Sequence, residues 1–500
     1  MRSRHEIRRS GLVLALLAGC ATTPDLSRLD LDSWLELRAR DFAIVADIAD
    51  ADLRRYAEDL AILVAVAGRL TNVSPAISQV PVRVVLAPPD VYGALVREPR
   101  IPGIATTRLE GHWLLVRLDE TASFTQETLL HEYTHFLEHK NRRVSYPLWY
   151  GEGFAELLST VHRRDDLVSA GAAPWDRLYA LRRTPKLDLE PIFAQRRDNV
   201  VRDVDLFYAL SWATVHYLSE APERRVQLQR FLALRRDDVP WRDAVTRAFD
   251  ASVEQLSERV DAHVRAILRG VPSEIAAYQA SELALDRDWQ VGQVSAAEVA
   301  AELGDIALPL TSLAARAEPV ACDFFAHAVE EDPRHARARA ASALCDARAG
   351  DFEAADVQIS DALRAAPDDS RVAVRAGQIE VLRARADSPG ADDARRTARE
   401  AFVRATALAP ADPVAWAELG ASYAEDDRDP QPGIDALERA QTLGAWDADV
   451  NLDLGRLLLR AGRRDAARER FAEVARIADG DPAREAERLL AELAPGAEAP

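Results

Sequence analysis

The pattern of hydrophobic and polar positions changes its period several times along the chain, and these changes predict its elements. Residues 31–70 carry apolar side chains at helical spacing, with a short strand expected near 41–45. Residues 81–87 are apolar and β-branched, which is typical of a strand, and residues 112–118 form a second expected strand. Residues 127–139 contain neither Pro nor Gly and predict a helix. The N-terminal half should therefore combine a small sheet with helices.

The C-terminal half repeats a helical pattern. An Ala-x3-aromatic-x2-Ala-x4-Pro spacing ends at Pro333 and again at Pro410, and a looser copy ends at Pro367. Pro333 and Pro367 are 34 residues apart, which is the period of tetratricopeptide repeats. Residues 416–423 match the W-x2-L-G-x2-Y signature of the first helix of such a repeat. The pattern predicts an all-α solenoid of four to five repeats over 302–490, with a concave face for a protein partner; a generic helical bundle is the alternative.

The N-terminus has the pattern of an export signal. Basic residues precede a short apolar stretch, residues 11–17, which is too short for a permanent membrane helix. The L-A-G-C motif that ends at Cys20 resembles the lipobox of bacterial lipoproteins, which implies that residues 1–20 are a signal peptide and that the Cys20 thiol is lipidated. Residues 21–30 would then be a tether, and Ala21 in place of Asp directs the anchor to the outer membrane, facing the periplasm. An ordinary secretory signal is the alternative.

One motif in the predicted helix 127–139 carries candidate chemistry. His131 and His135 are four residues apart, so both imidazoles can face one metal ion from the same side of a helix. Glu132 lies about 100° round the helix, where the general base for a metal-bound water is expected. Further on, Glu152 is the natural third ligand, because a catalytic zinc takes three protein ligands and keeps one position open. Glu156, one helical turn later, can accept a hydrogen bond from a liganding His. The alternative is two solvated helix faces.

The two motifs together resemble a known enzyme class. The H-E-x-x-H of residues 131–135 and the W-Y-G-E-G-F-A-E of residues 149–156 are similar to those of the gluzincin metallopeptidases, especially the short peptidase MA-like domains of bacterial lipoproteins and repeat proteins. The resemblance implies an α+β zincin-like domain over 31–270. It also implies that the two histidines and Glu152 hold Zn²⁺ and that Glu132 is the catalytic base.

Further residues enter through the same resemblance. Gluzincins place an edge strand beside the zinc, which implies that residues 112–118 pair with an extended substrate; a plain core strand is compatible with this role. They also place a Tyr or His well downstream of the third ligand, where it stabilises the oxyanion. By analogy of position Tyr208 is the candidate, with His216 behind it, and the alternative is that Tyr208 packs in a helical core. We interpret His139 as a surface residue of the last helical turn.

Composition and the remaining cysteines limit the partners and the covalent links to be expected. The 500 residues carry a net charge of −19 and have no basic cluster beyond the N-terminus, so nucleic acid is not expected as a partner. Cys322 and Cys345 fall in predicted helices without metal-ligand spacing. Two buried thiols are favoured over the disulfide that export would permit. Residues 271–301 are expected to be a weakly helical connector, and residues from the second motif to 270 to be almost entirely helical.

These observations predict a helix-dominated, exported and membrane-anchored zinc peptidase of the cell envelope, in which zinc activates water to hydrolyse a protein or peptide substrate. The solenoid would recruit a partner or the substrate. Two alternatives remain at this point: a catalytically idle scaffold lipoprotein that works through its repeats, and a zinc amidase that acts on cell-wall peptide.

Overall fold

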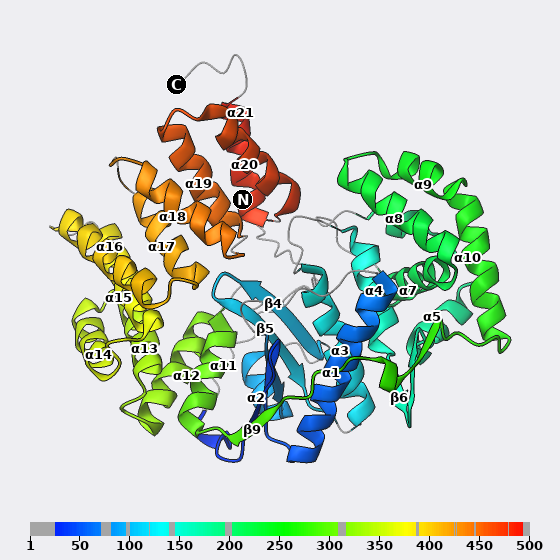
Figure 1. Ribbon diagram of the computed structural model, residues 1–500, viewed down its shortest axis with the longest axis horizontal. Coiled ribbons are helices and arrows are strands. Elements are labelled where there is room, and N and C mark those ends of the chain that lie inside the picture. The colour runs from blue at the N-terminus through cyan, green and yellow to red at the C-terminus, as the bar shows by residue number, and fades with distance from the viewer. Residues whose placement is uncertain are drawn as a thin grey trace, which may run out of the picture.

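The computed structural model describes residues 26–71, 82–96, 101–119, 121–139, 146–195, 203–308, 317–386, 390–424, 426, 428–444, 447–478 and 480–493. Helices dominate the chain, and the N-terminal half also forms one larger and one smaller sheet. Figure 1 shows the larger sheet between two groups of helices, the stacked helices of the C-terminal half on one side and the helices of residues 204–268 on the other. A helix-dominated fold with a small sheet is therefore confirmed.

The larger sheet has the strand order β4-β5-β3-β2-β1-β9. Its strands are β1 (Leu35–Arg38), β2 (Phe42–Ala46), β3 (Val82–Ala87), β4 (Gly103–Arg108), β5 (Gly111–Arg117) and β9 (Gln290–Gln293). Strand β3 runs parallel to both β2 and β5, and the other neighbouring pairs are antiparallel. The strands predicted at 41–45, 81–87 and 112–118 are confirmed. The helix predicted from residue 31 is wrong in its first part, because β1 and β2 come before it and it begins at Asp50.

The prediction that residues 112–118 form an edge strand is also wrong. Strand β5, which contains most of residues 112–118, lies inside the sheet between β3 and β4. The chain reaches β5 through a hairpin, in which Gly103 pairs with Val116 and Arg108 with Gly111 across the turn Leu109–Glu110. Because β4 therefore covers the outer side of β5, β4 is the edge strand at this end of the sheet, and β9 is the edge strand at the other end.

Helices cover both faces of the sheet. Helices α1 (Asp50–Thr71) and α3 (Ala122–His139) pack on one face, and α2 (Pro89–Leu95), α11 (Ala296–Ala307) and α12 (Ala317–Glu331) pack on the other. Along β3 the side chains alternate between the two cores, with Val84 in the first and Val85 in the second. Burial on both sides explains why every residue of β3 except Arg83 is apolar.

Residues 271–301 differ from the expected weakly helical connector. Strand β8 (Ala276–Gln279) completes a three-stranded sheet with β6 (His162–Arg164) and β7 (Leu167–Ala170), and β9 pairs with β1. The expectation failed because these short strands have a mixed polar pattern and are fixed by pairing with distant partners. Strands β6 and β7 also interrupt the segment that was expected to be helical up to residue 270. That segment otherwise consists of α5 (Trp175–Arg183), α6 (Glu190–Phe193), α7 (Val204–Glu220), α8 (Pro222–Arg236), α9 (Trp241–Phe249) and α10 (Val253–Leu268).

The C-terminal half forms consecutive helix pairs, as the repeat pattern predicts. Within the described residues the pairs are α11 with α12, α13 (Ala336–Arg348) with α14 (Phe352–Ala365), α15 (Ser370–Arg385) with α16 (Ala391–Leu408), α17 (Pro413–Ala424) with α18 (Gln431–Thr442) and α19 (Ala448–Arg460) with α20 (Arg464–Ile477), followed by α21 (Gly480–Glu492). The signature Gly420 lies against Leu437 of the paired helix, so closely that a Cβ would overlap that side chain. A small residue at this position therefore lets the two helices of a repeat approach each other.

The two helical cysteines form a disulfide, so the preference for two thiols is wrong. Cys322 of α12 and Cys345 of α13 are 23 residues apart in sequence, and their Cα atoms are 5.9 Å apart. The second helix of one pair packs beside the first helix of the next pair, and this packing brings the sulfurs together. Across the described residues we find no helix long and apolar enough to span a membrane. Cys20 and its motif lie outside the described residues.

Candidate metal centre

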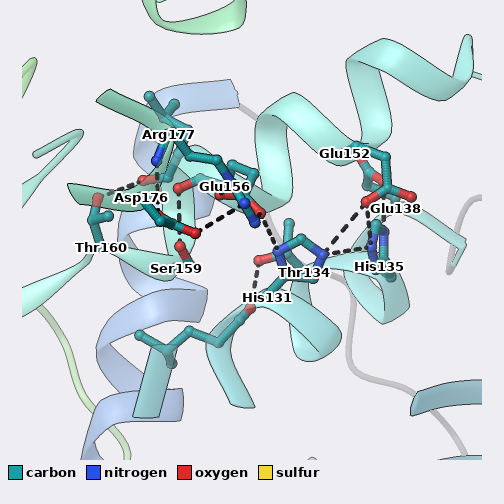
Figure 2. A network of polar contacts seen from close by, with 12 residues as sticks. His131, Thr134, His135, Glu138, Glu152, Glu156, Ser159, Thr160, Asp176 and Arg177 are labelled. Carbon is teal, nitrogen blue, oxygen red and sulfur yellow. Dashed lines mark hydrogen bonds and ion pairs between the residues drawn. The ribbon is translucent and has the colours of Figure 1, made fainter. Parts of the chain in front are cut away.

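The predicted ligands come together between two helices. His131 and His135 project from α3, and Glu152 projects from α4 (Leu148–Ser159). The Nε2 atoms of the two histidines are 3.1 Å apart, and Oε2 of Glu152 lies 3.4 Å from each of them. One ligand atom from each residue lies within 4.8 Å of the other two. Figure 2 shows the three side chains pointing toward one another.

A close contact between helices fixes the position of Glu152. Its neighbour Gly153 faces α7, and a Cβ at this position would overlap the backbone carbonyl of Ser211. Glycine therefore allows α4 to lie directly against α7. This packing buries Glu152, whose exposed fraction is 4%, and directs its carboxylate toward α3.

Each histidine also faces a carboxylate with its second ring nitrogen. Nδ1 of His131 is 3.4 Å from Oε1 of Glu156, and Nδ1 of His135 is 3.6 Å from Oε2 of Glu138. Liganding histidines are commonly oriented by such carboxylates, which hold the ring and leave Nε2 to the metal. The position of Glu156 agrees with the sequence prediction. Glu138 was missed, although its spacing of three residues from His135 on one helix was a usable signal.

Arg177 of α5 is a second residue that the sequence did not indicate. Its Nε donates to Oε2 of Glu156 and its terminal nitrogen donates to Oε1, both at 2.9 Å. The guanidinium carbon also lies 5.1 Å from the centre of the Tyr208 ring. Arg177 thus fixes the carboxylate that faces His131 and contacts the Tyr208 ring as well (Figure 2 shows the Glu156 contact). No local motif connects Arg177 with the two motifs that carry the candidate metal ligands.

The electrostatics of the cluster favour a cation. Burial raises the pKa of the Glu152 carboxyl, but His135 and His131 outweigh burial and hold this pKa well below its usual range. Burial lowers the pKa of His135, but Glu152 and Glu138 raise it well above its ordinary value. Oε2 of Glu152 is buried and accepts no hydrogen bond within the described residues. Two imidazole nitrogens and one carboxylate oxygen are a donor set that fits zinc and leaves a fourth position open.

Glu132 lies between this cluster and the edge strand. A Cβ built on Gly103, the first residue of β4, would be 2.8 Å from Cγ of Glu132 and 2.6 Å from Cγ2 of Thr128. The bare backbone of Gly103 therefore packs against Glu132. The candidate base is thus positioned by the same strand that ends the sheet.

The structure places Tyr208 of α7 beside the cluster, with its ring centre 6.1 Å from that of His131. Burial, together with Glu152 and Glu156, raises the pKa of the Tyr208 hydroxyl well above its ordinary value, so the hydroxyl stays protonated. His216 does not serve as an alternative, because its Nε2 lies 2.6 Å from the Ser273 carbonyl and its Nδ1 lies 2.9 Å from His263. The backbone of α3 extends to His139, whose side chain lies outside the described atoms.

No protein-family model and no curated protein matches this sequence. Similar solved structures include a tetratricopeptide protein from Thermus thermophilus, with 18% identity, 39% of this chain and 98% of that chain covered, and a TM-score of 0.34. PilF from Pseudomonas aeruginosa shares 19% identity over 39% of this chain and 90% of its own, with a TM-score of 0.30. MamA from Desulfovibrio magneticus shares 19% over 39% of this chain and 96% of its own, with a TM-score of 0.27.

Proposed function

We propose that the protein is a zinc-dependent peptidase with a helical-repeat arm that recruits a protein partner or the substrate. One observation carries the proposal: two Nε2 atoms and a buried carboxylate oxygen converge on one point, while both Nδ1 atoms face carboxylates. A chance cluster of histidines needs no such orientation of both rings. In keeping with the sequence, we also propose export, lipidation at Cys20 and a place on the periplasmic side of the outer membrane.

The residues around the cluster have separate roles in the proposed reaction. A zinc ion held by His131, His135 and Glu152 would polarise the scissile carbonyl and lower the pKa of a water molecule. Glu132 accepts the proton of the attacking water and passes it to the leaving amine. The protonated Tyr208 hydroxyl donates a hydrogen bond to the carbonyl oxygen as it gains negative charge.

The substrate and the histidines are held by neighbouring groups. Strand β4 offers its outer edge to an extended substrate backbone, because within the described sheet it pairs with β5 alone. Glu156, fixed by Arg177, orients His131, and Glu138 orients His135. Substrate and base therefore meet at the start of β4, where Gly103 packs against Glu132.

Glu132→Gln tests the proposal with the full chain. The amide keeps the size of the side chain but cannot accept a proton, so zinc should stay at about one ion per chain while hydrolysis of unfolded casein falls by about 10²–10⁴. Zinc is measured by mass spectrometry and hydrolysis by release of labelled fragments. Glu258→Gln, on the exposed side of α10, is the matched control and should behave as the parent. A parent that binds zinc and cleaves no polypeptide, or an undiminished Glu132→Gln variant, would contradict the proposal.

A further inference from the structure

The β4–β5 hairpin connects the metal centre to the solenoid. Strand β4 begins at Gly103, which packs against Glu132, and ends at Arg108. The turn that follows carries Leu109, which packs against the apolar core that helices α17 to α21 share. Figure 1 shows this hairpin reaching from the sheet to the α17–α19 part of the stack. One short strand therefore has one end at the proposed reaction site and the other at the repeats.

At this point the inner face of the solenoid is hollow. A cavity of about 1190 Å³ runs along the first helices of successive pairs, α11, α13, α15, α17 and α19. The hairpin forms part of its wall through Arg108, Leu109, Glu110 and Trp113. We call this cavity the inner groove. Its volume is large enough for a segment of extended chain.

The arginines of the inner groove are concentrated on two neighbouring helices. Five arginines from α13 and α15 line one part: Arg337, Arg348, Arg371, Arg375 and Arg385. Three aspartates at the start and along α19 line the part that α19 forms: Asp447, Asp449 and Asp453. Asp305 of α11, Asp412 just before α17 and Glu418 of α17 also line the groove. A basic wall stands out in a chain whose net charge is −19. The charge pattern therefore favours an occupant with an acidic stretch against α13 and α15.

The two ends of the turn carry opposite charges and lie near different helices of the groove. Arg108 lowers the pKa of Asp449, which burial raises, so the basic end of the turn lies near the acidic wall. Burial raises the pKa of Asp305 to about 6, Arg375 opposes this rise and Glu110 adds to it. Glu110 thus lies in the region of Asp305 and Arg375, so the turn places a basic group near α19 and an acidic group near α11 and α15.

We propose that a single extended polypeptide occupies the inner groove and the edge of β4 at the same time. Its acidic stretch lies against Arg371 and Arg375, the chain passes the turn, and it continues along β4 to Glu132. This inference rests on the proposed function and names its substrate class: unfolded polypeptide with an acidic stretch. The six residues of β4 span about 20 Å, so cleavage falls at a fixed distance from the acidic stretch.

The first test measures binding in the full chain carrying Glu132→Gln, with fluorescein-labelled casein, an acidic unfolded protein, as the probe. Arg371→Glu with Arg375→Glu turns two attractions into repulsions and should weaken binding about tenfold, as measured by fluorescence anisotropy. The control reverses two arginines that do not line the groove, Arg396→Glu with Arg439→Glu, and should bind as the parent. Absent binding to the parent, or equal effects of both pairs, would overturn the inference.

The second test asks whether one chain spans both places. A photo-crosslinker, p-benzoylphenylalanine, replaces Thr106 in β4, and labelled casein is added below its dissociation constant. Crosslinking should fall about tenfold when Arg371 and Arg375 are reversed, in step with binding. A crosslinking yield that stays unchanged would show that strand and groove bind separately, which overturns the inference. Binding and crosslinking could behave as expected while the zinc-loaded parent does not hydrolyse casein. In that case the proposed function fails, but the inference that one polypeptide occupies the inner groove and the edge of β4 stands.

Discussion

Replacing Gly103 by Ala should slow hydrolysis without removing zinc. The new Cβ would lie 2.6 Å from Cγ2 of Thr128 and 2.8 Å from Cγ of Glu132. Ordinary carbon–carbon contacts are about 3.5–4.0 Å, so the strand or these side chains must move by about 1 Å. A displacement of about 1 Å in a reacting group can cost about 10²-fold in rate. We therefore expect kcat/KM to fall by about 10–100-fold, and the overpacked contact to cost about 1–3 kcal/mol of stability.

The assay compares kcat/KM, zinc content and unfolding free energy of Gly103→Ala with those of the parent. Gly93→Ala is the matched control, because a Cβ at Gly93 would meet nothing within 4 Å. Thr128→Ser removes Cγ2, the atom closest to the new Cβ. The double variant Gly103→Ala with Thr128→Ser should therefore recover part of the rate. If Gly103→Ala keeps the full rate, Glu132 either tolerates the displacement or is not the base, and the reasoning is refuted.

Three other expectations concern the ligands, the disulfide and pH. Glu152→Ala should lose zinc as well as activity, whereas Glu156→Ala should weaken zinc binding by about 10–100-fold, measured by competition with a chelator; equal zinc affinity in parent and Glu152→Ala would place the third ligand elsewhere. Reduction of Cys322–Cys345 should cost about 3 kcal/mol of unfolding free energy, because the bridge closes a loop with a sequence separation of 23 residues; equal denaturant midpoints in the oxidised and reduced chain would contradict this. Burial and the neighbouring His216 lower the pKa of His263 from 6.5 to about 4, so the unfolded chain binds a proton that the folded chain does not. Stability should therefore fall as pH drops from about 6.5 to about 4, and His263→Gln should flatten that part of the stability curve; an unchanged curve would argue against the shift.

The sequence alone determined the features that depend on local spacing. Two histidines four residues apart on a helix must face the same way, whatever surrounds them, and a glutamate on the next helix could be named as their partner. Glu156 was predictable for the same reason, since it lies one turn beyond Glu152. The helix pairs could also be predicted, because the small and apolar residues through which the paired helices pack recur at a fixed period.

The tertiary structure decided what depends on contacts between distant segments. The sequence placed the edge strand at β5, but a hairpin covers β5 and makes β4 the edge, and strand order is set by packing of the whole sheet. Arg177, 21 residues from Glu156, approaches it only because α5 packs against α7. Strands β8 and β9 gain their structure from strands more than a hundred residues away in the chain. Local periodicity encodes which elements form, whereas the free energy that selects their neighbours comes from burial and hydrogen bonding after the chain has folded back on itself.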